Sequence, residues 1–199
     1  MDARVEQAAW HNRAAMTYDL AAATAHLRAA EPRFAPLIER HGVPTLTPTR
    51  DPFASLGSAI IYQQLAGAAA KTIHGRVCAL FPRKRFPRPA ALAATPLPRL
   101  RSAGLSEAKA RALLDLAAHF GDRRLTTRGL LTADDEAVAR LLLPVRGIGP
   151  WSVDMFLRFG LGRADVWPVG DFGRSFIFYD AEGNMIQLWE HTARATHRA

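Results

Sequence analysis

Apolar residues recur at three- and four-residue steps through most of the first 160 positions, which is the period of amphipathic helices. The pattern predicts an opening helix over 19–30 with Asp19 as its N-cap, a second short helix around Phe34–Ile38, and a loop over 43–50. No convincing strand alternation precedes residue 160, so the body of the chain is predicted to be all-α. Residues 1–18 have no clear period and are predicted to form a loose leader.

N-cap residues, prolines and glycines divide the central part of the chain into further helices. Asp51 and Pro52, an acidic N-cap and a first-turn proline, open a helical region of about thirty residues that is compatible with two helices. A loop over 81–89, rich in proline and arginine, ends this region, and it can either contact phosphate or simply be solvated. Three more helices are predicted over 95–104, over 106–120, and from Thr132 onward.

The segment 143–151, with the sequence LPVRGIGPW, lies between the last of these helices and another predicted over 151–159. Gly147 and Gly149 permit a tight turn whose backbone can approach a ligand closely. The N–H groups at the start of the following helix can donate hydrogen bonds to an anion. The side chain of Ile148 is expected to pack in the core. A Gly-x-Gly pair alone is most often merely a turn, but its position between two amphipathic helices favours a functional interpretation.

Composition and charge narrow the class of protein. The 199 residues are 49% apolar and 22% charged, as expected for one globular domain with a small appendage. The formal net charge of +8 comes mostly from arginine, which suits phosphate, although genomic base composition explains the excess equally well. The one cysteine, Cys78, excludes an internal disulfide or a four-cysteine metal centre. No apolar run approaches the length of a membrane span, so a cytoplasmic protein without membrane contact is expected.

Four motifs, in order, resemble the helix-hairpin-helix DNA glycosylase superfamily and, within it, the 3-methyladenine DNA glycosylase II (alkylbase DNA glycosylase) branch. The hairpin is followed by DVWPVGDFG at 165–173, the earlier helix carries DPF at 51–53 and IIYQQL at 60–65, and AGLSEAKA at 103–110 is similar to the middle signature. The resemblance covers residues 19–174. It implies a two-lobed all-α fold with a cleft between the lobes, a minor-groove approach to duplex DNA, and flipping of the damaged nucleotide.

The resemblance implies that Asp171 is the catalytic residue. A carboxylate beside the sugar can stabilise an oxocarbenium-like transition state or orient the attacking water. A helix-capping role for Asp171 is the alternative and is compatible with catalysis, while Asp165 is a second candidate that is more typical of a turn. The implied reaction is hydrolysis of the N-glycosidic bond of alkylated purines, of the 3-methyladenine and 7-methylguanine type, in duplex DNA during base-excision repair.

Trp151 stands where the bifunctional members of the superfamily carry a lysine nucleophile. Because an indole cannot form a Schiff base, a monofunctional glycosylase is expected. Trp151, Trp167, Tyr62 and Phe53 are candidates for the base pocket, where their π faces would hold a cationic base. For each aromatic taken singly, core packing is an equally good interpretation, and Trp151 is the preferred candidate.

The resemblance also implies DNA contacts outside the pocket. Gln64, with its neighbour Gln63, matches the side chain that the family inserts in place of the flipped nucleotide, and the polar face of a surface helix is the alternative. Gly147, Ile148 and Gly149 are implied to bind a DNA phosphate through their backbone. No cofactor and no metal ligands are implied apart from a monovalent cation at the hairpin carbonyls, and the protein is expected to be a monomer that binds double-stranded DNA with alkylated bases.

Beyond residue 174 the sequence departs from the family pattern. Residues 175–190 contain two β-rich runs around a Gly-Asn turn, which predicts a β-hairpin. This hairpin resembles the closing hairpin of the glyoxalase/dioxygenase (vicinal oxygen chelate) fold, with Gln187 where a metal-ligating glutamate is common. A glycosylase domain over 19–174 that is C-terminally truncated, with a short appended, foreign-looking tail over 175–199, is therefore expected. A catalytically impaired DNA-binding module from a truncated or fused gene and, on the tail alone, a glyoxalase-type enzyme are the alternatives.

Overall fold

The computed structural model describes residues 19–82, 85–163 and 166, and the backbone of 169–170, 173–179 and 185–190. In chain order the helices are α2 (Leu20–Ala30), the 3₁₀ turn η1 (Pro32–Phe34), α3 (Ala35–His41), α4 (Pro52–Tyr62), α5 (Gly67–Ala79), α6 (Pro89–Ala93), α7 (Leu97–Ser102), α8 (Glu107–Gly121), α9 (Thr127–Thr132), α10 (Asp135–Leu142), α11 (Pro150–Met155) and the π-helical turn η3 (Phe156–Gly160).

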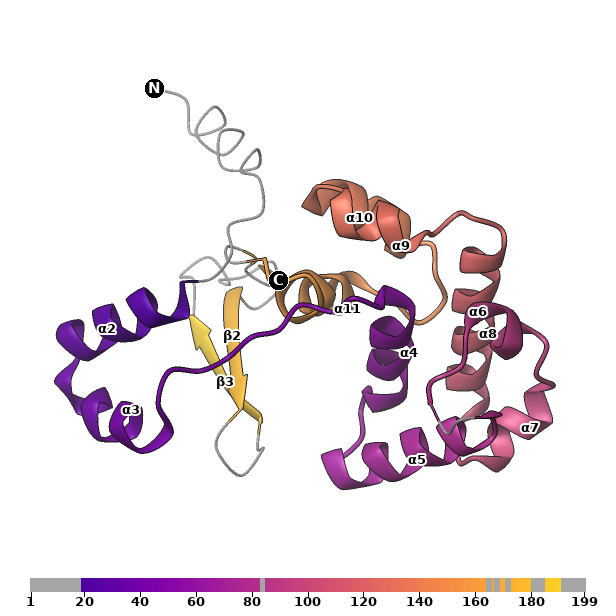
Figure 1. Cartoon of the computed structure of the whole chain (residues 1–199), viewed down its shortest axis with the longest axis horizontal. Coiled ribbons are helices and arrows are strands. Elements are labelled where there is room, and N and C mark those ends of the chain that lie inside the picture. The colour runs from indigo at the N-terminus through magenta and orange to yellow at the C-terminus, as the bar shows by residue number, and fades with distance from the viewer. Residues whose placement is uncertain are drawn as a thin grey trace, which may run out of the picture.

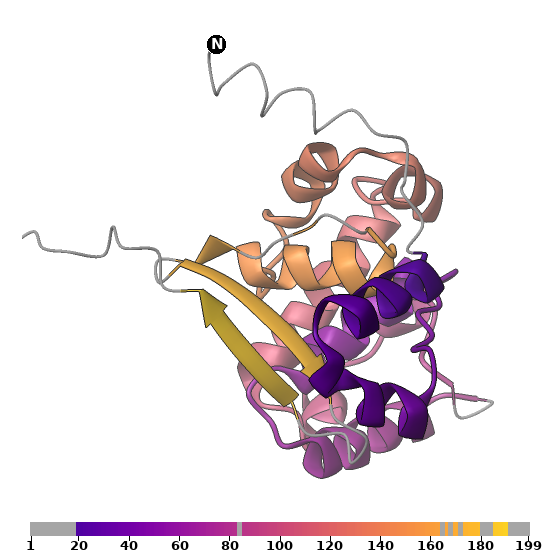
Figure 2. The same ribbon diagram turned by 90° about the vertical axis from the view of Figure 1, so that its left-hand side faces the viewer.

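These helices form two groups, which Figure 1 separates along the long axis of the molecule. Helices α4 to α10 form the larger lobe, α2 and α3 lie on the other side, and α11 lies between the two groups. Figure 2, turned by 90°, shows α2 and α3 in front of the other helices. The two-lobed all-α body confirms the predicted fold class.

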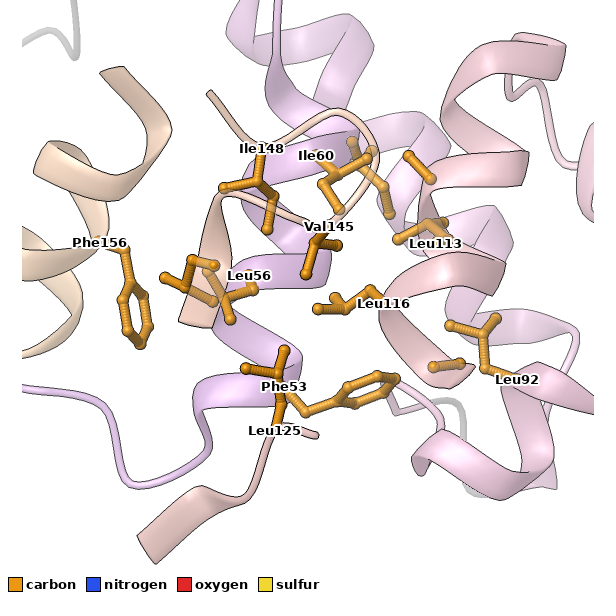
Figure 3. Close-up of a cluster of buried hydrophobic side chains, with 14 of the residues drawn as sticks. Phe53, Leu56, Ile60, Leu92, Leu113, Leu116, Leu125, Val145, Ile148 and Phe156 are labelled. Atoms are coloured by element: carbon orange, nitrogen blue, oxygen red, sulfur yellow. The ribbon is translucent and has the colours of Figure 1, made fainter. Parts of the chain in front are cut away.

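The core of the larger lobe lies between α4 and α8 (Figure 3). Leu56 and Ile60 on α4, and Leu113 and Leu116 on α8, are buried, and their spacing of three or four residues places each pair on one face of its helix. Burial of one such side chain stabilises the fold by about 1.5–3 kcal/mol. Ile148 of the hairpin joins the same cluster, so the hairpin is anchored to the hydrophobic core of the lobe.

Local sequence signals set the start of the longer helices. Asp19, Asp51 and Ser106 each accept a hydrogen bond from the backbone N–H three residues further on, which confirms them as N-caps. The short helices α6 and α9 were not predicted. The predicted start at Thr132 is wrong, because Thr132 ends α9 and Asp134 is the N-cap of α10.

The C-terminal part of the described chain contains strands. They are β1 (Val169–Gly170), β2 (Gly173–Tyr179) and β3 (Met185–Glu190), which form one antiparallel sheet in that order. Phe176 of β2 lies opposite Leu188 of β3, which confirms the predicted hairpin, whereas β1 is an additional strand. The leader 1–18 and the turn 180–184 lie outside the described residues, and the domain boundary at 174 stays a prediction.

The N-terminal helices α2 and α3 bury no side chain within the described part of the chain. An ion pair 2.7 Å long between Arg28 and Glu39 joins them at the surface, where such pairs contribute little free energy. Apolar side chains are exposed next to this pair, among them Phe34 of the turn η1 and Leu37 of α3. Among the described helices, none has the length and apolar character needed to cross a membrane.

Candidate nucleic-acid interface and active site

The hairpin of residues 143–149 joins α10 to α11. Its turns are closed by backbone hydrogen bonds from the N–H of Val145 to the carbonyl of Leu142 (3.0 Å) and from the N–H of Ile148 to the carbonyl of Val145 (3.1 Å). Ile148 is 5% exposed and packs in the core, as the sequence predicted. The side chain of Ile148 is therefore unavailable to a ligand, so the segment from Gly147 to Gly149 can contact one only through its backbone groups.

The two hairpin glycines have different structural reasons to be glycine. Gly147 has φ +78°, in the left-handed region, and a Cβ there would stand 3.1 Å from Cβ of Ala112 on α8. The fold therefore requires glycine at this position. Gly149 has an ordinary φ of −104°, and a Cβ would meet nothing within 4 Å. The fold accepts a larger residue there, so the absence of a side chain leaves open space in front of the first turn of α11.

This open space is bordered by backbone donors. Within the described part of the chain, the N–H groups of Gly147 and Gly149 form no hydrogen bond. Gly149 is the N-cap of α11 and Pro150 its first residue, so the positive end of the helix dipole is directed to the same place. Unpaired N–H groups at a helix N-terminus are an anion-binding arrangement.

Side chains from two other helices fix the hairpin in place. The Asp115 carboxylate on α8 accepts a hydrogen bond of 2.8 Å from the N–H of Arg146. The side-chain amide of Gln63, at the end of α4, donates to the carbonyl of Gly147 (2.9 Å) and to Oγ of Ser152 (3.1 Å). The side-chain amide of Gln63 is thereby bonded to the hairpin and to α11, whereas no hydrogen bond of this kind holds the side chain of Gln64 within the described part of the chain, so Gln64 is the preferred wedge candidate.

The residues 63–66 form the α4–α5 turn, which carries Gln64. Gln64 has φ +55°, and both Gln64 and Leu65 are exposed. Lys109 on α8 holds this turn, because its Nζ donates to the carbonyls of Ile61 (2.8 Å) and Gln63 (2.6 Å). This role of Lys109 was not predicted, since nothing local in the sequence indicates a contact with residues so far back along the chain.

The predicted base-pocket aromatics separate into exposed and buried residues. Tyr62 is 41% exposed and Trp151 is 42% exposed, so both rings are accessible. Phe53 is 3% exposed, and its ring centroid lies 5.1 Å from that of Phe120 and 5.8 Å from that of Phe86. The predicted place of Phe53 in the base pocket is therefore wrong, because its ring is packed inside the larger lobe.

A small groove lies between α4 and the helix formed by α11 and η3. Its volume is about 230 Å³, and its lining residues are Ser55, Ala59, Met155, Phe156, Phe159 and Gly160. Tyr62 lies one turn beyond Ala59, and Trp151 one turn before Met155, so both exposed rings follow the lining faces of their helices. Pockets for larger ligands measure about 300–1,000 Å³, so the groove has the scale of a single small ring system.

Three predicted residues, Asp171, Asp165 and Trp167, lie outside the described residues. The chain that leads toward them is anchored at the end of η3, where the buried Arg158 guanidinium donates to the carbonyl of Val166. Arg158 also lies near Asp154, whose pKa is raised by burial and is lowered in part by the positive charge of Arg158. The π-helical turn η3 is of a kind frequently found at functional sites.

Two histidines of the larger lobe, His74 and His119, have structural contacts. His74 forms a hydrogen bond of 3.0 Å between its Nε2 and Oγ of Ser58, and burial lowers its pKa. His119 is buried and places Nδ1 2.9 Å from the carbonyl of Asp115. In the described part of the chain, no group of three or more His, Cys, Asp or Glu residues is placed to hold a metal ion.

The two helical groups and the rigid hairpin between α10 and α11 define a helix-hairpin-helix protein. Residues 58–177 match the family model described as the HhH-GPD superfamily base excision DNA repair protein. The chain therefore belongs to the HhH-GPD superfamily, as its motifs indicated.

Proteins similar to this chain are glycosylases by name. The DNA-3-methyladenine glycosylase of Saccharomyces cerevisiae is 36% identical over 135 residues, which cover 62% of this chain and 44% of the yeast protein. The crystal structure of the DNA-3-methyladenine glycosidase from Bacillus halodurans is 36% identical, with a TM-score of 0.61 over 74% of this chain and 67% of that chain. The 3-methyladenine DNA glycosylase of Schizosaccharomyces pombe, solved in complex with abasic DNA, is 28% identical, with a TM-score of 0.53 over 73% of each chain. The chain spans about half the length of the first two curated relatives it matches, at 50% and 44%.

Alanine substitutions at the two hairpin glycines test their different roles. Gly147→Ala is expected to lower the free energy of unfolding by at least about 1–2 kcal/mol, because alanine pays for a left-handed φ and its Cβ approaches Ala112. Gly149→Ala is expected to leave the unfolding free energy unchanged but to weaken binding to a duplex oligonucleotide. Urea unfolding and fluorescence anisotropy measure the two quantities. Unchanged DNA affinity in Gly149→Ala would show that DNA does not approach this side of the hairpin.

Proposed function

We propose that this chain is a monofunctional DNA glycosylase that removes alkylated purines, of the 3-methyladenine and 7-methylguanine type, from duplex DNA by flipping the damaged nucleotide. The observation that carries the proposal is the pairing of a hairpin with open backbone donors and an apolar groove beside the exposed ring of Trp151. Membership of the HhH-GPD superfamily and the similarity to DNA-3-methyladenine glycosylases support the same activity.

Binding to DNA begins with charge. A net charge of +8 favours association with a polyanion, and the resulting affinity falls as salt concentration rises. A phosphate at the hairpin accepts hydrogen bonds from the N–H groups of Gly147 and Gly149 and is stabilised by the dipole of α11. Such backbone contacts fix the position of the duplex without reading its sequence.

A monovalent cation at the hairpin is part of the proposal. The metal ligands that the hairpin offers are neutral carbonyl oxygens, which suit a hard cation. The carboxylate of Asp115 already accepts the N–H of Arg146, and the carbonyl of Gly147 already accepts the amide of Gln63. A low-charge ion therefore fits the remaining oxygens, and when bound it supplies positive charge toward a phosphate.

Flipping moves the damaged base out of the base stack, so that it lies between protein groups and no longer between the neighbouring bases. We assign Trp151 and Tyr62 to the base site, because both rings are exposed and follow the helix faces that line the groove. Alkylation at N3 or N7 leaves the purine cationic, and a cation is attracted to the face of an indole ring. Gln64 is assigned to fill the gap in the duplex, since it projects from the exposed α4–α5 turn.

Asp171 is assigned to the chemistry. Its ionised carboxylate stabilises the positive charge that develops on the sugar as the N-glycosidic bond breaks, or orients the water that attacks the anomeric carbon. The cationic base departs without a proton from a strong acid. Trp151 provides no amine for a Schiff base, so strand cleavage does not follow.

Replacement of the proposed catalytic carboxylate tests the activity. The unmodified chain is expected to release free 3-methyladenine from methylated duplex DNA, and Asp171→Asn is expected to slow release by about 100-fold or more, because an amide stabilises positive charge poorly. Chromatography of the released bases measures the rate, and anisotropy verifies that Asp171→Asn still binds DNA. Salt-dependent DNA binding without any release by the unmodified chain would contradict the proposal and favour a DNA-binding module without catalysis.

Substitution of Trp151 tests the base site. Trp151→Ala is expected to reduce kcat/KM for the cationic base 7-methylguanine by about 30-fold, the equivalent of about 2 kcal/mol of cation–π attraction in a desolvated site. Excision of an uncharged purine lesion is expected to fall less, and Trp151→Phe is expected to retain part of the activity because a smaller π face remains. Equal losses for charged and uncharged bases would show that Trp151 contributes packing alone.

A further inference from the structure

Lys109 lies on α8 and reaches back to the end of α4. The last carbonyl groups of an α-helix have no partner within the helix, and the last turn of α4 contains no basic residue of its own. Nζ of Lys109 lies 2.8 Å from the carbonyl oxygen of Ile61 and 2.6 Å from that of Gln63, and it donates to both. The negative end of α4 is thus capped by an ammonium group that another helix supplies.

The residue that follows this cap has an unfavourable backbone conformation. Gln64 has φ +55°, and the left-handed region costs a residue other than glycine about 1–2 kcal/mol. The carbonyl of Gln63 that Lys109 binds belongs to the peptide group immediately before Gln64. Lys109 therefore fixes the orientation of that peptide and, with it, the direction in which the exposed side chain of Gln64 leaves the protein.

The same helix α8 also holds the hairpin. Asp115 accepts the N–H of Arg146 at 2.8 Å, and the side chain of Gln63 donates to the carbonyl of Gly147 at 2.9 Å. The end of α4, the hairpin and α8 are consequently linked in a closed circuit of hydrogen bonds. Any movement of the α4–α5 turn relative to the hairpin breaks at least one of these bonds.

In the described part of the chain, the ammonium group of Lys109 has no other partner than the carbonyls of Ile61 and Gln63. Lys109 forms no ion pair with a described carboxylate, and burial lowers its pKa. A partly buried ammonium is unfavourable unless hydrogen-bond acceptors replace its water. The carbonyls of Ile61 and Gln63 are those acceptors, so the contact with the α4–α5 turn is what keeps the charged group there.

We propose that Lys109 is a positioning residue for base flipping, which holds Gln64 at a set distance and direction from the phosphate-binding hairpin. The inference rests on the proposed function, because it takes Gln64 as the group that enters the duplex. Lys109 does not touch the substrate in this proposal. It acts through the α4–α5 turn, so its loss impairs the opening of the base pair and leaves the chemistry of an opened nucleotide intact.

The test compares two duplexes that differ in how easily the lesion leaves the stack. Both contain 7-methylguanine, placed opposite cytosine in one and opposite an abasic site in the other, where no pairing has to be broken. Lys109→Met, which keeps the side-chain length and removes the ammonium, is expected to lower kcat/KM on the paired lesion by about tenfold or more and on the unpaired lesion by less than about threefold. Lys109→Arg, which can still donate to two carbonyls, is expected to restore most of the difference.

Two controls separate positioning from general effects. Lys71→Met removes the charge of an exposed lysine on α5, and it is expected to change kcat/KM for both duplexes by the same factor. Gln64→Ala removes the proposed wedge and is expected to reproduce the selective loss on the paired lesion. Adding Lys109→Met to Gln64→Ala is expected to cause little further loss, because the two residues act through one step.

Equal losses on both duplexes in Lys109→Met, a selective loss in Lys71→Met, or independent losses in the double variant would each overturn the proposal. Fluorescence of 2-aminopurine placed beside the lesion reports flipping without excision. Together with a measurement of DNA binding, this signal tests the role of Lys109 even if the chain excises no base. If the unmodified chain binds DNA and gives the flipping signal, and Lys109→Met abolishes that signal, the role of Lys109 is supported although the proposed glycosylase activity fails. If Lys109→Met does not fold, Lys109→Arg provides the test. A folded Lys109→Arg variant whose kcat/KM falls selectively on the paired lesion would contradict the positioning role of Lys109.

Discussion

The packing of the hairpin against α8 is the contact on which the rest of the candidate site depends. Gly147 approaches Ala112 so closely that a Cβ on it would stand only 3.1 Å from the alanine Cβ, and Ile148 enters the core beside α4 and α8. These apolar contacts fix the hairpin without using its outward backbone donors. The donors consequently stay free for a ligand while the turn itself is held rigid, which is the combination that a preformed anion site requires.

Helix α4 contributes to the core and to the proposed DNA surface through different faces. Leu56 and Ile60 are buried against α8, whereas Ser55 and Ala59 line the groove that faces α11. The end of the helix then leads into the α4–α5 turn. One helix therefore sets the relative positions of the groove, the turn and the hairpin, so that a ligand in contact with all three meets a single rigid body.

Much of the fold could be predicted because its signals are local. N-caps such as Asp51 and Ser106 and the apolar period of α8 depend on residues within a few positions of each other, and these predictions are confirmed. The aromatic residues were harder, because Phe53 and Trp151 both lie in the first turn of a helix and only tertiary packing distinguishes them. Phe53 faces other rings in the core, and Trp151 faces outward.

The polar contacts that assemble the candidate site could not be predicted, because they join distant parts of the sequence. Gln63 and Gly147 are 84 positions apart, and Lys109 and Gln63 are 46 apart. Contacts of such separation form only after the intervening chain has been closed into loops, and this closure costs entropy and slows folding. The arrangement of turn and hairpin therefore requires α4, α8 and the hairpin to be packed together. The surface proposed to contact DNA is thus completed late, when the helices have already docked, and a partly folded chain lacks it.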